Sequence, residues 1–167
     1  MVQIDPGPTQ LPLFVYGTLL PNQPNAALWG SAVARWEAAA LAPAHLYDFG
    51  AYPMLVESDH GTVHGMIATI QPARYDAVLT RLDQLERYDP AQPDKGPYRR
   101  RVRHVQLSDG SNRPVWIYLG TPDLVKGLPR ISHGDWAAHT VQHQARLHLW
   151  WRRHRHDYDS RPPGDAG

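Results

Sequence analysis

The sequence contains no cysteine, and this absence excludes several kinds of chemistry at once. Without a thiol there is no disulfide framework, no thiolate nucleophile and no thiolate metal site. No segment approaches the roughly 18 consecutive apolar residues that a membrane-spanning helix needs. The first residues also lack the basic flank and the apolar run of a signal peptide. We therefore expect a cytoplasmic protein that does not insert into a membrane.

An excess of either charge is also missing. Lysine and arginine number 17 against 16 acidic residues, which gives a formal net charge of +1. Because the charge is nearly balanced, it provides no general attraction to nucleic acid or to an anionic membrane, and we expect neither as a partner. The sequence leaves the oligomeric state open.

Proline and glycine, by contrast, are abundant, with 16 and 13 copies in 167 residues. They lie mainly between short apolar runs, which predicts many short elements joined by turns. Strands are predicted at residues 11–16, 44–49, 54–56, 62–70, 98–107 and 115–119. The alanine-rich residues 33–42 fit either a helix or a strand. Gly65, inside one of the runs, indicates a bulge or a close approach of two backbones.

Two further helical segments complete the predicted fold. Asn25 is a candidate cap for a short helix at residues 26–29, and a terminal helix is predicted at residues 136–151. Five or six strands with one well-marked helix between them predict an α+β fold whose sheet curves or closes around a cavity. The predicted organisation is a flexible leader at residues 1–10, one domain at 11–151 and a disordered basic tail at 152–167.

The best-marked helix is predicted between Arg74 and Tyr88. Its apolar residues recur at steps of three and four, as on one face of a helix, at Tyr75, Val78, Leu79, Leu82 and Leu85. Glu86 follows Leu82 by four residues, so its carboxylate falls within this apolar stripe. Asp83 lies at the flank of the stripe and is predicted to be a helix-surface or loop-bracing residue.

A carboxylate that faces a protein core has two common explanations. It forms an ion pair, for which Arg99, Arg100 and Arg101 are the candidate partners of Glu86, or it has a raised pKa and transfers protons near neutral pH. The periodicity of the helix alone does not decide between these two roles.

Four stretches that occur in order resemble one family. They are Val15-Tyr16-Gly17-Thr18-Leu19, Leu46-Tyr47-Asp48-Phe49-Gly50-Ala51-Tyr52-Pro53, Leu82-Asp83-Gln84-Leu85-Glu86-Arg87-Tyr88 and Tyr98-Arg99-Arg100-Arg101-Val102. Together they resemble the gamma-glutamylcyclotransferase-like superfamily, which includes gamma-glutamylamine cyclotransferase and many small bacterial proteins. The resemblance covers residues 11–136.

The resemblance implies a small mixed β-barrel with a central cavity and a reaction that needs no cofactor and no metal. The α-amine of a small γ-glutamyl compound attacks its own γ-carbonyl, which forms 5-oxoproline and releases the acylated amine. The catalytic acid/base corresponds to Glu86. The substrate-binding candidates are the backbone N–H groups of Gly17, Thr18 and Leu19, together with four tyrosines as walls and hydrogen-bond donors, namely Tyr16, Tyr52, Tyr98 and Tyr118.

Three other interpretations compete with this one. A non-catalytic module could use the same cavity to bind a small metabolite. The basic tail could bind nucleic acid, although acidic residues follow in the same segment. His139 and His143, four residues apart on the predicted terminal helix, have a spacing that can hold zinc, but a solvated helix face is the favoured interpretation because no third ligand is evident.

Overall fold

The computed structural model describes residues 10–142 of the chain. The chain divides into two compact units, residues 1–136 and residues 137–167. Within the second unit, residues 137–142 are helical. The predicted tail at 152–167, the predicted domain limit at residue 151, and all of the predicted leader except Gln10 lie outside the described residues. Within residues 10–142, no helix combines the length and the apolar character needed to cross a bilayer.

The first unit contains eight strands, one α-helix and three short 3-10 helices within the described residues. In chain order they are β1 (Leu13–Val15), η1 (Ala26–Trp29), β2 (Val33–Leu41), β3 (Ala44–Asp48), β4 (Pro53–Glu57), β5 (Val63–Ile70), η2 (Pro72–Arg74), α1 (Tyr75–Leu85), β6 (Arg99–Leu107), β7 (Asn112–Leu119), η3 (Pro122–Val125) and β8 (Arg130–Ile131).

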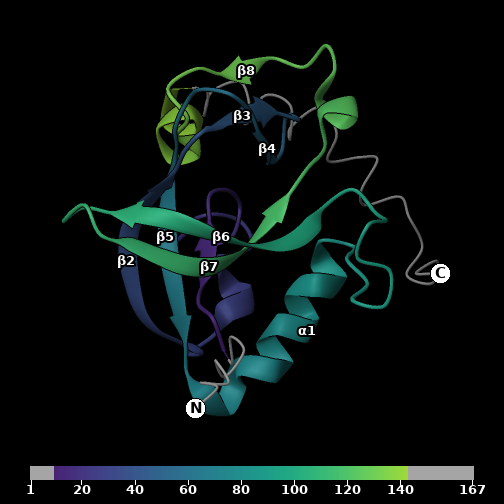
Figure 1. Cartoon of the computed structure of the whole chain (residues 1–167). Helices are drawn as coiled ribbons and strands as arrows, with labels where there is room; N and C mark the ends of the chain where they lie inside the picture. Colours follow the sequence, from purple (N-terminus) through teal and green to yellow (C-terminus); the bar gives the residue numbers. More distant parts are fainter. Residues whose placement is uncertain (1–9, 143–167) are drawn as a thin grey trace, which may run out of the picture. The chain divides into compact units, whose positions relative to one another are not determined.

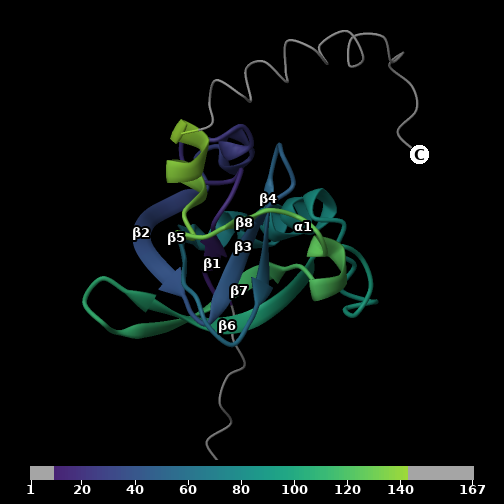
Figure 2. The same cartoon turned by 90° about the horizontal axis from the view of Figure 1, so that it is seen from above.

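Five strands close into a barrel in the order β1-β5-β2-β6-β7. All neighbours in the barrel are antiparallel except β1 and β7, whose parallel pairing of Leu13 with Trp116 closes the ring. The strands β4, β3 and β8 form a second, three-stranded sheet. This sheet lies over the barrel strands, and α1 lies on the other side of the barrel (Figures 1 and 2). The α+β fold with a mixed barrel that the sequence predicted is confirmed.

Strand β2 settles the segment that the sequence left open. It pairs along its length with β5, from Val33 opposite Ile70 to Leu41 opposite Val63. The pairing with a neighbouring strand outweighs the helix propensity of its alanines, since propensity is a weak preference that tertiary context overrides. As a consequence, α1 follows the fifth strand of the chain, one strand later than the sequence indicated.

The core has a layer on each side of the barrel wall. Phe14 belongs to the cluster on the side of the second sheet, whereas Leu13 and Val15 belong to the cluster that packs against α1. All three residues are buried, as the continuous apolar run of β1 predicted. Gly65 is the point of close backbone approach, because a Cβ at this position would collide with the Val15 carbonyl and the Phe14 ring.

Helix α1 buries Tyr75, Val78, Leu82 and Asp83. Burial of Val78 and Leu82 contributes about 1.5–3 kcal/mol each. The predicted apolar stripe is wrong at its end: Leu85 is 40% exposed, and the helix stops there, so Glu86 follows it as the C-cap residue.

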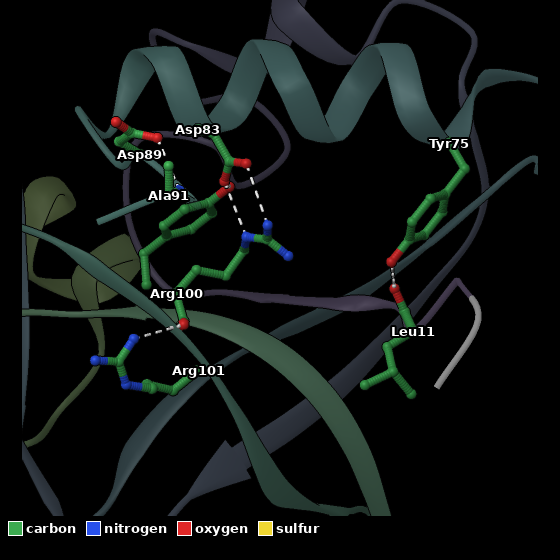
Figure 3. Close-up of polar contacts among 8 residues, drawn as sticks. Leu11, Tyr75, Asp83, Asp89, Ala91, Arg100 and Arg101 are labelled. Atoms are coloured by element: carbon green, nitrogen blue, oxygen red, sulfur yellow. Dashed lines mark hydrogen bonds and ion pairs between the residues drawn. The ribbon is translucent and has the colours of Figure 1, made fainter. Parts of the chain in front are cut away.

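A buried ion pair fixes the last turn of α1 to the barrel. Asp83 accepts hydrogen bonds from Nε and Nη2 of Arg100 at 2.9 and 3.2 Å, and from the Tyr118 hydroxyl at 2.7 Å (Figure 3). The Arg100 guanidinium also lies over the Trp116 ring, 4.4 Å from its centroid. The prediction that Asp83 is a helix-surface or loop residue is therefore wrong.

The first turn of α1 has its own attachment to the barrel. The Tyr75 hydroxyl donates to the Leu11 carbonyl at 2.6 Å, just before β1 (Figure 3). The helix is thus attached at both ends, by a neutral hydrogen bond at its start and by an ion pair at its end.

We predict that Asp83→Asn lowers the free energy of unfolding by about 3 kcal/mol, because it leaves the Arg100 charge buried without a counterion. Urea denaturation monitored by circular dichroism measures this change. The matched control is Asp94→Asn, since Asp94 pairs with Arg101 but is 84% exposed and its loss should cost less than about 1 kcal/mol. Equal effects of the two substitutions would contradict the importance assigned to the buried pair.

Candidate functional site

Glu86 occupies the turn that ends α1. Its backbone N–H donates to the Leu82 carbonyl at 2.9 Å, and the N–H of Tyr88 donates to the Asp83 carbonyl at 2.8 Å. Between them, Arg87 adopts a left-handed backbone conformation with φ 55°, which reverses the chain direction as helix C-termini commonly do. Gly96 packs against this turn, because a Cβ there would lie 2.7 Å from the Arg87 carbonyl oxygen. The returning loop therefore holds Glu86 in place from outside.

The Glu86 side chain is partly buried, and its carboxylate makes no hydrogen bond or ion pair with any residue from 10 to 142. Burial raises its pKa from 4.5 to about 7. The ion-pair alternative is wrong for two of the three candidate arginines, since Arg100 pairs with Asp83 and Arg101 pairs with Asp94. For the third, Arg99, the structure gives no ion pair within the same residues, and its Nε is buried without a partner there.

Three of the four predicted tyrosines lie around Glu86. Burial raises the pKa of Tyr16 and Tyr98, and the Glu86 charge raises both further. Burial and the hydrogen bond to Asp83 likewise raise the pKa of Tyr118, with a smaller effect from Glu86. Electrostatic influence of this kind requires short separations, so the structure brings these three tyrosines and Glu86 together.

The hydroxyl protons of these tyrosines are already used within the protein. Tyr16 donates to the Tyr118 carbonyl at 2.6 Å, Tyr98 donates to the Pro53 carbonyl at 2.8 Å, and Tyr118 donates to Asp83. A tyrosine carries one hydroxyl proton. The role of hydrogen-bond donor to a substrate, which the sequence predicted, is therefore not open to them in this arrangement.

Tyr52 differs from the other three. It is 43% exposed and stacks on Phe49 with ring centroids 5.3 Å apart. It lies close enough to Tyr98 to act on its pKa, but Glu86 is not among the groups that it affects. Tyr52 is thus an accessible aromatic surface beside Tyr98 rather than part of the group around the carboxylate.

The turn after β1 presents backbone N–H groups. Its carbonyls are used internally: Gly17 accepts from the Leu20 N–H at 3.0 Å, and Thr18 accepts from the Asn25 N–H at 2.9 Å. The Leu19 carbonyl accepts from the Trp29 indole at 2.8 Å. The N–H groups of Gly17, Thr18 and Leu19 have no acceptor among residues 10–142. They are available to an anion or to a developing oxyanion.

Two residues that position the site escaped the sequence analysis. Asn25 does not cap η1; its side-chain amide donates to the Thr18 hydroxyl at 2.9 Å and braces the turn. Pro53 contacts this turn as well, because a Cβ on Gly17 would lie 2.7 Å from the proline ring. Since Pro53 also accepts the hydrogen bond of Tyr98, it connects the turn to that tyrosine. The occurrence of Pro53 in the second motif was the available signal.

No group of three or more histidine or acidic side chains within residues 10–142 is arranged to hold a metal ion. His143, one member of the predicted histidine pair, lies outside the described residues.

Several solved structures share this fold. YkqA from Bacillus subtilis aligns with a TM-score of 0.61 and 23% identity, over 82% of this chain and 43% of YkqA. An AIG2-like protein from Mus musculus gives a TM-score of 0.56 and 23% identity, over 75% of this chain and 87% of that chain. An Arabidopsis thaliana protein gives a TM-score of 0.55 and 25% identity, over 95% and 89%. This chain spans less than half the length of YkqA.

Sequence comparison supplies the family. Among curated proteins, none matches this chain. The family model described as "Gamma-glutamyl cyclotransferase, AIG2-like" matches residues 13–138, a range that includes the barrel, the second sheet, the Gly17 turn and Glu86. The chain therefore belongs to the gamma-glutamyl cyclotransferase, AIG2-like family.

Proposed function

We propose that the protein is a γ-glutamyl cyclotransferase, with Glu86 as general acid/base. It converts the γ-glutamyl group of a small γ-glutamyl amine or amino acid into 5-oxoproline and releases the free amine. The observation that carries this proposal is the partly buried Glu86 carboxylate, which has no protein partner within residues 10–142 and whose pKa burial raises to about 7. Family membership supports the class of reaction.

Proton transfer is the task that Glu86 performs in this reaction. The carboxylate takes a proton from the α-ammonium group of the substrate, and the resulting amine attacks the γ-carbonyl carbon, so that a carbon–nitrogen bond forms. When the intermediate collapses, the bond to the leaving nitrogen breaks and that nitrogen receives the proton. Glu86 carries the second proton in the same direction, so the positive charge ends on the released ammonium. A pKa near 7 suits a group that must both accept and donate protons.

Substrate binding and charge stabilisation fall to the turn and the tyrosines. The free N–H groups of Gly17, Thr18 and Leu19 bind the substrate carboxylate or the oxyanion that forms on the γ-carbonyl oxygen. Tyr16, Tyr98 and Tyr118 form walls around Glu86, and Tyr52 adds an exposed aromatic surface. Because the nucleophile belongs to the substrate, the main requirement is to hold the γ-glutamyl chain in a folded conformation.

We predict that Glu86→Gln lowers 5-oxoproline formation at least 100-fold, since the amide cannot transfer the proton. Mass spectrometry of a panel of γ-glutamyl amino acids, γ-glutamyl-ε-lysine and γ-glutamyl polyamines measures both the activity and the identity of the released amine. Glu57→Gln is the matched control, because Glu57 is an exposed acid paired with Arg103 and should leave turnover unchanged. A Glu86→Gln protein with full turnover would sink the proposal.

Stability at two pH values shows that Glu86→Gln remains folded. The pKa of Glu86 is about 7 when folded and about 4.5 when unfolded, so the folded chain binds more protons between these values. The contribution of Glu86 to stability therefore falls as the pH rises from about 4.5 to about 7. Glutamine does not titrate, so at pH 8 the variant should be at least as stable as the wild type in urea denaturation.

We predict that kcat/KM rises with pH through an inflection near 7, because the free protein needs the Glu86 carboxylate in its ionised form. Initial rates of 5-oxoproline release between pH 5 and pH 9 give this profile. An inflection near 4.5, or a profile that stays flat across this range, would mean that Glu86 does not govern the reaction through its raised pKa.

A further inference from the structure

The oxygen of the Tyr98 hydroxyl has unused acceptor capacity beside Glu86. Its one proton goes to the Pro53 carbonyl at 2.8 Å, and the direction of this bond is certain because a carbonyl oxygen can only accept. A hydroxyl oxygen has two acceptor positions, and no donor to Tyr98 occurs among residues 10–142. Burial keeps the Tyr98 pKa above its ordinary value, so the group remains a neutral hydroxyl near pH 7.

The two neighbouring tyrosine oxygens are placed differently. The Tyr16 oxygen faces the backbone N–H of Leu55 in addition to its bond to the Tyr118 carbonyl. The Tyr118 oxygen is held against Asp83, next to the Arg100 guanidinium. Both of these rings are buried, whereas Tyr98 is partly exposed. Tyr98 is therefore the tyrosine whose oxygen is best placed to meet a ligand.

The position of Tyr98 relative to the rest of the site follows from its contacts. Its ring packs against the cluster that contains Leu82, in the last turn of α1, and Tyr118. Its hydroxyl reaches Pro53, which contacts Gly17 in the turn with the free N–H groups. Tyr98 thus lies between the end of α1 and that turn.

The charges around Glu86 favour a cation. Burial alone raises the Glu86 pKa, and no arginine, lysine or histidine from residues 10 to 142 contributes to its shift. The nearest arginine of the network, Arg100, is neutralised by Asp83. A carboxylate with no cationic partner, next to a hydroxyl that can only accept, matches a primary ammonium, which carries three donors and no acceptor.

We propose that the Tyr98 hydroxyl oxygen and the Glu86 carboxylate together bind the α-ammonium group of the substrate, and that Tyr98 thereby selects γ-glutamyl compounds with a free α-amine. This inference rests on the proposed function for the identity of the ligand. It assigns to Tyr98 a hydrogen-bond acceptor role, which positions the nucleophilic nitrogen next to its base. Compounds whose α-nitrogen is absent or acylated lose this recognition.

The test compares two ligands that differ only at the α-position. L-glutamate 5-methylamide carries the α-ammonium, and glutaric acid monomethylamide lacks it. Calorimetric titrations use the Glu86→Gln protein to prevent turnover, with and without Tyr98→Phe. We expect Tyr98→Phe to weaken binding of the amino compound about tenfold, the size expected for a hydrogen bond to a charged group, and to leave the desamino compound unchanged.

Tyr75→Phe is the matched control. Tyr75 also donates to a backbone carbonyl, that of Leu11, but it lies at the other end of α1, about 16 Å away along the helix axis. It should change the affinity of neither ligand. The ratio of the two affinities is independent of the fraction of folded protein, so partial unfolding of a variant does not obscure the result.

Equal weakening of both ligands by Tyr98→Phe would overturn the inference, because it would show that the hydroxyl only supports the fold through Pro53. No discrimination between the ligands before the substitution, including no binding of either, would overturn it too. The proposed function is decided separately, by 5-oxoproline formation in the wild-type protein. An active enzyme whose Tyr98→Phe variant keeps its preference for the amino ligand would refute this inference alone.

Discussion

The arrangement of the candidate site depends on the buried ion pair between Asp83 and Arg100. Both side chains are about one-tenth exposed, so each charge has lost most of its water and depends on the other. The pair joins the last turn of α1 to β6, and the Tyr118 hydroxyl extends the connection to β7. Because breaking such a pair is costly, α1 cannot shift along the barrel. Glu86, three residues after Asp83, is fixed as a result.

Two acids in one turn of chain therefore have opposite surroundings. Asp83 is compensated by an arginine and a hydroxyl, whereas Glu86 has neither and its pKa rises to about 7. This contrast is how protein environments assign different tasks to identical functional groups. The Asp83 network also reaches the turn after β1, since the Tyr118 carbonyl accepts the hydrogen bond of Tyr16. The structural ion pair and the proton-transfer candidate belong to one connected set of contacts.

Sequence patterns predicted most strands and the mixed barrel, because apolar runs and glycine positions report which residues face inward. They did not identify β2 as a strand, since its alanines fit either structure until β5 is placed beside it. The pairing of Asp83 with Arg100 was missed because it joins residues 17 positions apart across two elements. Asp83 does lie eight residues after Tyr75, on the same side of the helix, which was a usable signal.

The hydroxyl directions in the site were beyond the sequence for the same reason. The carbonyls that take the protons of Tyr16 and Tyr98 lie 102 and 45 residues away along the chain. A motif can place a tyrosine near a site, but only the fold shows whether its hydroxyl donates or accepts. The catalytic role of Glu86, which the family motif implied, stays a prediction.

The most direct measurement is an NMR titration of the Glu86 side-chain carboxyl carbon, assigned by its loss in Glu86→Gln. The account predicts an inflection near pH 7, because burial without a cationic partner disfavours the carboxylate. An inflection near 4.5 would show an ordinary solvated carboxylate, and would contradict the assignment of Glu86 as the proton carrier.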